Sequence, residues 1–379
     1  MMNEQEGDGF MKAVTLMPGT SNVRLADIPE PRIFAKDAVK MRVLRVGICG
    51  TDREEACGGR AKAPRNSREL VIGHEMLGLV VETGKVVTRV RPGDYAVFTV
   101  RRGCGACVPC LRGRPDMCRS GRCQERGIWG LDGFQAQFVI DSEAYTVRVP
   151  SEIESVGVLT EPLSVAEKAI DEAVRVQTAR LPGAAATPLW LRQRRCLVAG
   201  LGPVGLLAAL ALRLRGAEVF GIDVVDAESP RPRWLNVIGG IYIDGRRIPP
   251  ERVQGLIGGM DLIIEAAGVP SLEFNLIDAL ATNGIYVLTG IPSGNSSLQL
   301  QGAELVRRLV LGNQLMFGSV NASRDHYQMA VDDLARAQLL WGDHLRRLVS
   351  HRLPYVDFKD VLARHEPEEI KMTLEWNES

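Results

Sequence analysis

Apolar and polar residues alternate in short stretches over the first part of the chain. In Ala38–Gly47, apolar and basic side chains follow one another with the two-residue period of a half-buried strand. Similar stretches recur and are separated by glycine-containing turns such as the one at 91–94. We predict a strand and then a loop in Lys12–Pro29, and further strands at Leu70–Ile72, Gly78–Val87, Tyr95–Val100 and within Gly127–Val149. This series of short strands predicts a partly open β barrel.

From Cys196 onward, short apolar runs alternate with stretches of helix-forming residues. Cys196–Ala199 predicts a strand, the Ala- and Leu-rich Val204–Arg215 predicts a helix, and Ala217–Ile222 predicts a second strand. Further strands are predicted at Asp261–Ala267, Gly284–Gly290 and Leu315–Val320, and helices at Leu159–Gln177, Leu272–Leu280 and Asp325–Leu340. Leu181–Arg195 is the predicted linker into this region. Strands that alternate with helices predict an α/β domain with a parallel sheet.

The turn after the first of these later strands has the glycine spacing G-x-G-x-x-G. Its residues are Gly200, Leu201, Gly202, Pro203, Val204 and Gly205. In that spacing, the glycines permit a sharp turn, the close approach of a pyrophosphate and tight packing of helix on strand. Asp223 ends the next strand, where a carboxylate can hold a ribose 2′-OH. These features predict dinucleotide binding, and the alternative is a tight turn in an unrelated α/β sheet.

Composition narrows the class of protein. The chain has 379 residues, which favours two domains, and its 46 basic side chains balance 46 acidic ones. This balance gives no electrostatic reason to expect nucleic acid or an anionic membrane as a partner. Met1–Phe10 lacks the features of a secretory signal, and no run is apolar enough to predict a membrane span. We therefore expect a cytoplasmic protein.

Four of the eight cysteines predict a structural zinc site. Cys104, Cys107, Cys110 and Cys118 have the spacing C-x2-C-x2-C-x7-C. Four thiolates that converge from tight turns complete a closed tetrahedral shell around one zinc ion. An iron–sulfur cluster is the competing interpretation, but the long last gap and the lack of a proline after Cys118 favour zinc.

A second group of possible metal ligands consists of Cys49, His74, Glu75 and Glu161. Each has an ordinary alternative role: a buried small hydrophobe, a loop histidine or a carboxylate at a helix start. Cys49 and His74, however, each follow a predicted strand in a loop with glycines, where side chains can converge. A mixed set of sulfur, nitrogen and oxygen ligands is typical of catalytic zinc.

Taken together, the motifs resemble those of the zinc-dependent medium-chain dehydrogenases. The matching stretches are G-I-C-G-T-D at 47–52, G-H-E at 73–75, R-P-G-D at 91–94, the four-cysteine segment and G-L-G-P-V-G at 200–205. The resemblance covers nearly the whole chain from Met11. Within that family, several segments resemble archaeal glucose 1-dehydrogenases: Arg101–Gly105, Gly127-Ile128, Asp132–Phe134, Glu161–Leu163, Val320-Asn321 and Glu369–Met372.

The resemblance implies an architecture and a reaction. A GroES-like catalytic domain would span 11–190 and be completed by about 322–379, and a Rossmann domain with a doubly wound parallel sheet would span 191–321. The active site would lie in the cleft between them. The reaction would oxidise an aldose, D-glucose or D-galactose, at C1 to the aldonolactone, with hydride transfer to NAD(P)+, in a homo-oligomer (dimer or tetramer). A polyol or secondary-alcohol dehydrogenase, or a non-catalytic nucleotide sensor, remains an alternative.

The resemblance also assigns residues to roles. It implies two zinc ions per subunit, the catalytic one held from Cys49, His74 and Glu75 with Glu161 taking part. Sugar hydroxyls would be contacted from Thr51, Glu125, Glu161 and Asn321. The nicotinamide half of the cofactor would lie along Thr289, Gly290, Ile291, Ser319, Val320 and Asn321. Thr51 is then placed to take the proton of the C1 hydroxyl.

Two positions depart from the family pattern. Val165 stands where sugar-binding relatives often carry a carboxylate, which leaves the exact sugar open. Asp223-Val224-Val225 stands where some relatives that use the phosphorylated cofactor have Asn-Arg-Arg. Because a carboxylate accepts from a 2′-OH and repels a 2′-phosphate, we predict NAD over NADP. NADP would be accepted if Arg231 or Arg233 folded back.

Overall fold

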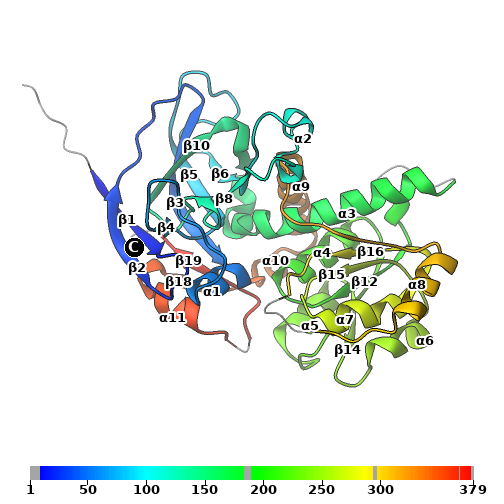
Figure 1. The fold of residues 1–379 in the computed structure, drawn as a ribbon. Helices are drawn as coiled ribbons and strands as arrows, with labels where there is room; N and C mark the ends of the chain where they lie inside the picture. The colour runs from blue at the N-terminus through cyan, green and yellow to red at the C-terminus, as the bar shows by residue number, and fades with distance from the viewer. Residues whose placement is uncertain (1–8, 183–188, 293–296, 367, 377–379) are drawn as a thin grey trace, which may run out of the picture. The chain divides into compact units, whose positions relative to one another are not determined.

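The computed structural model describes residues 9–182, 189–292, 297–366 and 368–376. The chain divides into two compact units: a first unit of Met1–Glu161, Ala322–Ala335 and Arg346–Ser379, and a second unit of Pro162–Asn321 and Arg336–Leu345. Helices α3 (Thr160–Arg180) and α9 (Arg324–Trp341) continue from one unit into the other (Figure 1). Most of Met1–Phe10 and the middle of the predicted linker lie outside the described residues.

The described part of the first unit is built on mixed β-sheets. Its largest sheet has the order β11-β6-β5-β3-β19-β18, with β10 also paired to β3, and two small sheets have the orders β2-β1-β4 and β7-β8-β9. The strands are β1 (Phe10–Leu16), β2 (Val23–Pro29), β3 (Ala38–Ile48), β4 (Leu70–Val71), β5 (Glu75–Thr83), β6 (Tyr95–Phe98), β7 (Arg101–Arg102), β8 (Gln124–Arg126), β9 (Gly130–Leu131), β10 (Phe138–Ser142), β11 (Thr146–Val149), β18 (Val349–Pro354) and β19 (Lys371–Glu375). Three helices belong to the same unit: α1 (Gly50–Ala56), α2 (Val108–Leu111) and α11 (Phe358–Ala363).

Strand β3 shows why alternation alone misplaces a side chain. Its basic residues were predicted to lie on a solvent face, but Lys40 and Arg45 are buried. The reason is that β3 has sheet partners on both edges and carboxylates within reach of its cations. Arg45 pairs with Glu154 and Glu375, and Lys40 pairs with Glu30.

The second unit contains a six-stranded sheet in the described residues, with the order β14-β13-β12-β15-β16-β17 and every pair parallel. Its strands are β12 (Arg195–Ala199), β13 (Glu218–Asp223), β14 (Ile241–Asp244), β15 (Met260–Glu265), β16 (Leu280–Leu288) and β17 (Leu315–Gly318). Its helices, which Figure 1 shows on either side of the sheet, are α4 (Pro203–Leu214), α5 (Pro230–Val237), α6 (Val253–Ile257), α7 (Pro270–Asn275), α8 (Gly302–Leu311) and α10 (Asp343–Arg346), together with most of α3. The sheet order is that of a Rossmann fold.

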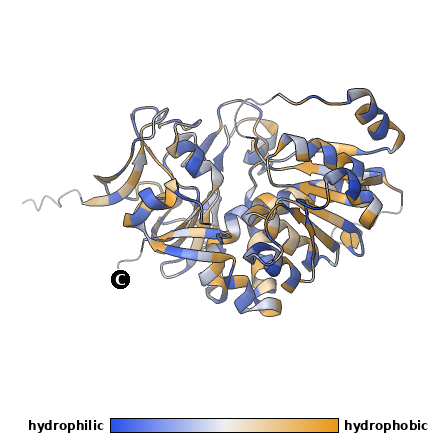
Figure 2. Cartoon of the chain, turned by 90° about the horizontal axis from the view of Figure 1, so that it is seen from below, coloured by the Kyte–Doolittle hydropathy of each residue, from blue (hydrophilic) through white to orange (hydrophobic). Residues whose placement is uncertain are grey.

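The cores of the two units follow from these sheets. Strands β12 and β15 of the second unit are almost entirely buried, as expected for parallel strands covered on both faces. Figure 2 shows the hydrophobic colours concentrated on the strands of a sheet, with the hydrophilic colours mainly on helices and loops. In the first unit, the inward side chains of β3, β5 and β6 form a core with α11 and β19. Among the described residues, no helix is long and apolar enough to span a bilayer.

Several predicted elements are wrong in detail. Lys12–Pro29 is a hairpin of β1 and β2, because its second half also pairs as a strand. The predicted helix 272–280 is α7 followed by a 3-10 turn, and β16 already begins at Leu280. Helices α1 and α8 were not predicted, because the first is short and the second lies in a stretch without clear helix-start signals.

Candidate active site

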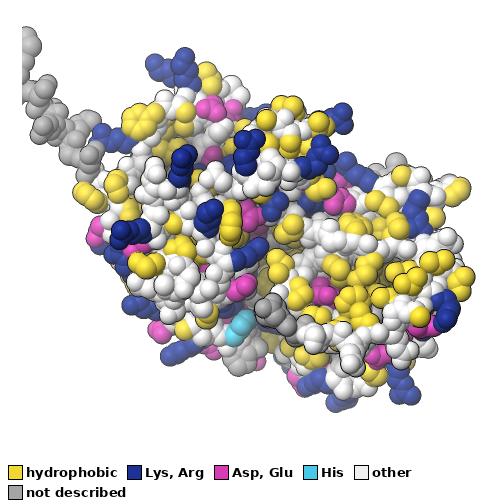
Figure 3. Space-filling model, in the orientation of Figure 1, with side chains coloured by type: hydrophobic (Ala, Val, Ile, Leu, Met, Phe, Trp, Pro, Cys, Tyr) yellow, Lys and Arg dark blue, Asp and Glu magenta, His cyan; other side chains and the backbone are white. Residues whose placement is uncertain are grey.

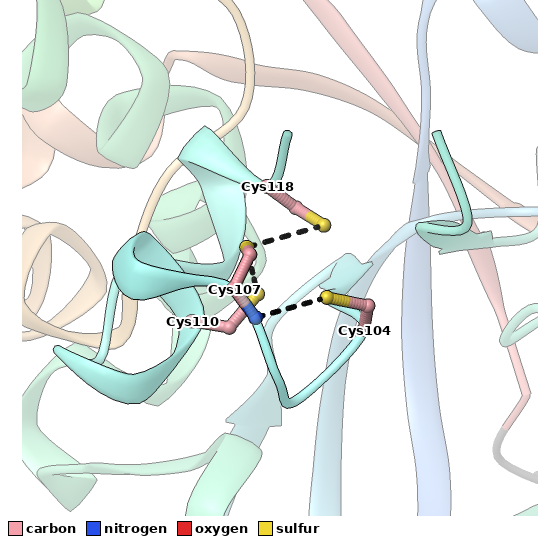
Figure 4. A group of neighbouring side chains, drawn as sticks. All are labelled: Cys104, Cys107, Cys110 and Cys118. Atoms are coloured by element: carbon pink, nitrogen blue, oxygen red, sulfur yellow. Dashed lines mark hydrogen bonds between the residues drawn. The ribbon is translucent and has the colours of Figure 1, made fainter. Parts of the chain in front are cut away.

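The four-cysteine segment forms a lobe between β7 and β8. Cys107 precedes the short helix α2, Cys110 lies within it, and Cys104 and Cys118 lie in the flanking turns. The four Sγ atoms all lie within 4.8 Å of one another. Cys107 Sγ is 3.4 Å from Cys110 Sγ and 3.9 Å from Cys118 Sγ (Figure 4). Tetrahedral Zn–S bonds of about 2.3 Å place sulfurs about 3.8 Å apart. The lobe therefore fits one zinc ion, while a cluster of several iron atoms would need more widely spaced sulfurs.

The surroundings of these thiols also suit a metal. Hydrogen bonding with Ser120 lowers the pKa of Cys104 to about 5 and that of Cys118 to about 7. Burial raises the pKa of Cys110 to about 12. Two thiols are thus readily ionised, and a bound cation would favour ionisation of the others, because zinc binds thiolates.

Cys49 and His74 lie together in the first unit. Cys49 directly follows β3 and is the N-cap of α1, and His74 directly precedes β5. The distance between Cys49 Sγ and His74 Nε2 is 3.1 Å. Strands β3 and β5 are paired in register at Gly47 and Glu75, and this pairing brings the two strand ends together. The convergence that was predicted from two loops therefore comes from neighbouring strands.

Asp52 is a member of this site that the sequence reasoning missed. Its Oδ2 accepts a hydrogen bond from the Cys49 backbone N–H at 2.9 Å, and its Oδ1 lies 3.4 Å from His74 Nδ1. The other ring nitrogen, Nε2, faces Cys49, so the thiol and the Asp52 carboxylate approach different nitrogens of the imidazole. At 3.4 Å, Asp52 Oδ1 and His74 Nδ1 form an ion-pair contact and not a hydrogen bond, and a carboxylate in that place can orient a histidine that binds a metal. Burial lowers the pKa of His74, but Cys49 and Asp52 outweigh burial and raise it.

Glu75 faces a buried cation. Lys371 of β19 forms an ion pair with Glu75, and both side chains are almost fully buried. The pair crosses above Gly47, where a Cβ would lie 2.9 Å from Lys371 Cε and closer still to Glu75 Oε2. Glycine at 47 is therefore required by space. Lys371 had been noted only as part of the C-terminal resemblance, and the sequence carries no local signal of its role.

Glu161 joins the group from the first turn of α3. Oxygens of Glu75 and Glu161 and a nitrogen of His74 lie within 4.8 Å of one another, while Cys49, Asp52 and His74 form a second, overlapping group. Burial raises the pKa of Glu161 to about 7, with nearby Glu75 adding to the effect. The other three predicted ligands thus lie around His74, and the sulfur, nitrogen and oxygen donors of the set suit zinc. Their roles as ligands stay a prediction.

The structure changes the context of two other predicted residues. Thr51 lies in the first turn of α1 and not in a loop, and its backbone N–H donates to Cys49 Sγ at 3.2 Å. Glu125 lies on β8, where Oε1 accepts hydrogen bonds from Arg101 Nε and Nη2 at 3.1 and 2.6 Å. Their predicted contacts with a sugar are not tested by this geometry.

The glycine turn of the second unit has the predicted form. It joins β12 to α4, Pro203 is the first residue of the helix, and Gly200 has a φ of +85°. A Cβ on Gly205 would lie 1.8 Å from the Gly200 carbonyl oxygen, so only glycine fits there. Asp223 ends β13, and its Oδ2 accepts a hydrogen bond from Leu201 N–H at 2.7 Å. The carboxylate thus lies beside the turn that would receive the pyrophosphate.

The remaining predicted cofactor residues follow the neighbouring strands. Thr289, Gly290 and Ile291 come directly after β16, and Ser319, Val320 and Asn321 come directly after β17. Carboxyl ends of adjacent parallel strands lie along one edge, which is where such sheets bind nucleotides. Asn321 has a left-handed φ of +60°, and the buried Lys168 donates to the Val320 carbonyl at 2.8 Å. Sequence reasoning did not find Lys168, because its partner lies 152 residues away.

Comparison with known proteins agrees with these features. The family model for the alcohol dehydrogenase GroES-like domain matches residues 35–151, and the one for the glucose dehydrogenase C-terminus matches 154–376. Glucose 1-dehydrogenase of Methanocella arvoryzae is 37% identical over 96% of this chain and 99% of its own length. Glucose 1-dehydrogenase 2 of Vulcanisaeta moutnovskia is 38% identical over 96% and 99%.

A solved structure agrees as well. Haloferax mediterranei glucose dehydrogenase in complex with NADP, Zn and gluconolactone is 30% identical, covers 97% of this chain and 100% of its own, and superposes with a TM-score of 0.86. The predicted family and the predicted fold, a GroES-like domain with a Rossmann sheet, are confirmed. The chain belongs to the glucose dehydrogenase family of zinc-dependent medium-chain dehydrogenases.

Proposed function

We propose that the chain oxidises D-glucose at C1 to the aldonolactone, with hydride transfer to NAD(P)+, and that it holds one catalytic and one structural zinc ion. The observation that carries the proposal is that His74 belongs to two overlapping groups in the first unit, one with Cys49 and one with Glu75 and Glu161. Relatives named glucose 1-dehydrogenase that align over nearly the whole chain support the substrate class.

In the catalytic site, Cys49, His74 and Glu75 hold the zinc ion, and Glu161 shares in its coordination. When bound, zinc supplies Lewis acidity that lowers the pKa of a substrate hydroxyl. Asp52 orients His74 from behind, and Lys371 balances the charge of Glu75. Two ion pairs, Asp52 with His74 and Lys371 with Glu75, thereby fix the orientation of the proposed ligands in a buried environment.

Thr51 takes the proton of the C1 hydroxyl in this proposal. Its place in the first turn of α1, with its backbone N–H donated to Cys49 Sγ, puts the residue next to the proposed ligand Cys49. Thr51→Val should lower kcat about a hundredfold or more, the usual contribution of a positioned proton acceptor. Zinc content should stay at two per chain. Thr51→Ser is the matched control, and unchanged turnover in Thr51→Val would remove the proton-transfer role.

The sugar would be held by Thr51, Glu125, Glu161 and Asn321. Arg101 anchors Glu125 through one carboxylate oxygen. The left-handed backbone of Asn321 is a conformation that costs energy outside glycine and often marks a functional site.

NAD is the preferred cofactor in this proposal. Asp223 is followed by two valines, so no cation adjoins it in the sequence. Arg233 pairs with Glu228 at 2.8 Å, and Arg246 pairs with Asp244 at 2.7 Å, so these two guanidinium groups already have carboxylate partners. The structure of the Haloferax relative contains NADP, so a preference of this chain for NAD would be a difference between the two proteins. The test is the ratio of kcat/KM for the two cofactors, and a higher value for NADP would contradict the preference.

A homo-oligomer is the expected assembly. Strand β17 is an edge of the six-stranded sheet, and helix α8 exposes Val306, Val310 and Leu311. Hydrophobic side chains gather over the region of α8 in Figure 3. Exposed apolar surface of this kind favours association of copies. Sedimentation of wild type and Val310→Glu should show a dimer or tetramer that weakens in the variant, and a monomeric wild type would contradict it.

The main alternative is another substrate in the same family, a polyol or a secondary alcohol. A panel of aldoses, polyols and alcohols with NAD and NADP, run with zinc quantified per subunit, separates these readings. Turnover of D-glucose or D-galactose above that of sorbitol and threonine supports the proposal. Cofactor binding without any turnover would favour the non-catalytic alternative. We retain the cytoplasm as the predicted compartment, since the zinc lobe requires reduced cysteines.

A further inference from the structure

The order of the strands in the second unit's sheet reverses between the central strands β12 and β15. The chain passes from β12 to β13 and β14 on one side of the sheet, and β15, β16 and β17 lie on the other. Ligands of such sheets bind where the strand order reverses, outside the carboxyl ends. Ala199, which ends β12, is paired with Glu265, which ends β15. Glu265 therefore stands at the reversal point.

The side chain of Glu265 is fully buried and holds the loop that follows it. Its Oε1 accepts hydrogen bonds from the backbone N–H groups of Ala267 and Gly268, both at 2.6 Å. Its backbone carbonyl accepts from Thr289 N–H at 2.8 Å and from Thr289 Oγ1 at 2.6 Å. One residue thus anchors the turn after β15 and the turn after β16.

These turns pack too closely for side chains. A Cβ on Gly290 would lie 2.2 Å from Gly268 N and 2.6 Å from Glu265 Oε2. A Cβ on Gly200 would lie 2.9 Å from the backbone nitrogen of Ala267. The turn after β15 is therefore in contact with the turns after β12 and β16, and the Glu265 carboxylate lies against the turn after β16.

Burying a carboxylate is unfavourable unless hydrogen bonds compensate for the lost hydration. Burial raises the pKa of Glu265, and the backbone N–H groups of Gly268 and Ala267 oppose that effect. Ile263 and Tyr286, on the same strand and the adjacent one, belong to the hydrophobic core of the second unit, where an apolar side chain is the usual choice. A carboxylate at this position has a role that an apolar side chain could not fill. Its Oε1 orients the backbone N–H groups of Ala267 and Gly268 at the edge of the proposed nucleotide site.

We propose that Glu265 is a positioning residue for the nicotinamide cofactor, which pre-forms the turns at 266–268 and 289–291 before the cofactor binds. The inference rests on the proposed function only in requiring a dinucleotide, and not on the identity of the sugar. Glu265 acts through the backbone of these turns and does not need to touch the cofactor.

The test compares Glu265→Asp and Glu265→Gln, with Tyr286→Phe as a buried control on the adjacent strand. Asp keeps the charge but is one methylene shorter, so it cannot reach both N–H groups, while Gln keeps an acceptor at the same reach. Glu265→Asp should raise the Kd for NADH and NADPH about tenfold, the usual effect of losing a buried acceptor. Glu265→Gln and Tyr286→Phe should stay within about threefold, and zinc content should not change.

Wild-type affinity in Glu265→Asp, or equal losses in the Asp and Gln variants, would overturn the inference. Hydrogen exchange on the wild type gives a second measurement that does not depend on a variant folding. The amides of Ala267 and Gly268 should be protected before NADH is added, and protection that appears only with NADH would overturn the inference. A wild type that binds nucleotide without oxidising glucose would contradict the proposed substrate alone, and one that binds neither nucleotide would overturn both.

Discussion

The two groups of proposed metal ligands in the first unit are assembled in different ways. The cysteine lobe draws its four ligands from a stretch of 15 residues, Cys104–Cys118, and they are only partly buried. The second group takes Cys49, His74, Glu75 and Glu161 from three separate elements, and its histidine and carboxylates are buried. A local knuckle needs short turns, whereas the second group needs the completed sheet.

The two groups also differ in what surrounds them. Hydroxyl and backbone groups of the lobe itself lower the pKa of Cys104 and Cys118. The second group is supported by charged residues from elsewhere, Asp52 on α1 and Lys371 on β19. A proposed structural site can thus take nearly all its supporting groups from its own segment of chain. The proposed catalytic site, in contrast, depends on residues from other elements to orient its ligands.

The largest expected effect is loss of turnover in Cys49→Ala. Removing the thiolate should lower kcat/KM about a thousandfold or more, because a catalytic metal contributes several kcal/mol to the transition state. Zinc should fall from two to one per chain, and NAD should still bind. Cys57→Ala, at an exposed cysteine after α1, is the control. Retained turnover with one zinc would show that the two groups have been assigned the wrong way round.

Cys104→Ala should instead reduce stability. Loss of one thiolate opens the tetrahedral shell, so one zinc is released and the free energy of unfolding falls by about 4 kcal/mol, part of what a structural zinc contributes. Thermal unfolding with zinc analysis measures both effects. Cys123→Ala is the matched control, because Cys123 lies near the lobe but outside the four-cysteine group. An unaltered melting temperature would contradict a structural role.

Asp141→Asn tests whether the lobe also has an anchor that needs no metal. Asp141 accepts hydrogen bonds from Arg102 and Arg126, which lie on the strands before and after the lobe. Burial opposes ionisation, but the two guanidinium groups outweigh it and lower the pKa of Asp141 below its ordinary value of 3.8. Removing the charge should destabilise the chain by about 3 kcal/mol at pH 7, because the buried Arg102 and the partly buried Arg126 lose their shared partner.

The pH dependence follows from the direction of that shift. Because the pKa of Asp141 is lower in the folded chain, ionisation stabilises the fold above about pH 4, and this contribution is lost as the pH falls through the folded pKa. The difference between wild type and Asp141→Asn should therefore shrink in acid. Asp27→Asn, in an exposed pair with Lys12, should change stability by less than about 1 kcal/mol. A difference that does not depend on pH would exclude the charge as the cause.

The smallest expected effect is that of Asp52→Asn on the second group. Asn can still accept from the Cys49 N–H but cannot balance a proton on His74 Nδ1. Zinc affinity of one site should fall about 10- to 100-fold, as is usual for residues that support metal ligands. Competition with a chelator measures it, and the slowly released zinc of the lobe is the internal reference. Equal losses at both sites would contradict the separation drawn here.

The sequence was most informative where structure is local. The glycine turn, the start of α4 at Pro203 and the four-cysteine lobe all depend on residues a few positions apart, and all have the predicted geometry. The hairpin of β1 and β2 and the helix α1 were missed, because a short element carries little periodic signal. Asp52 and Lys371 were missed for another reason, since nothing near them in the chain marks their partners.

The sequence by itself determined the spacing of ligands and glycines, and through them the family, the zinc lobe and the nucleotide turn. Only the tertiary structure decided which charged residues stand behind His74 and Glu75, and that Glu265 joins the turns after β15 and β16. The physical reason is that backbone conformation and tight turns depend on neighbouring residues. The pairing of a buried charge, in contrast, depends on which strands the sheet places side by side.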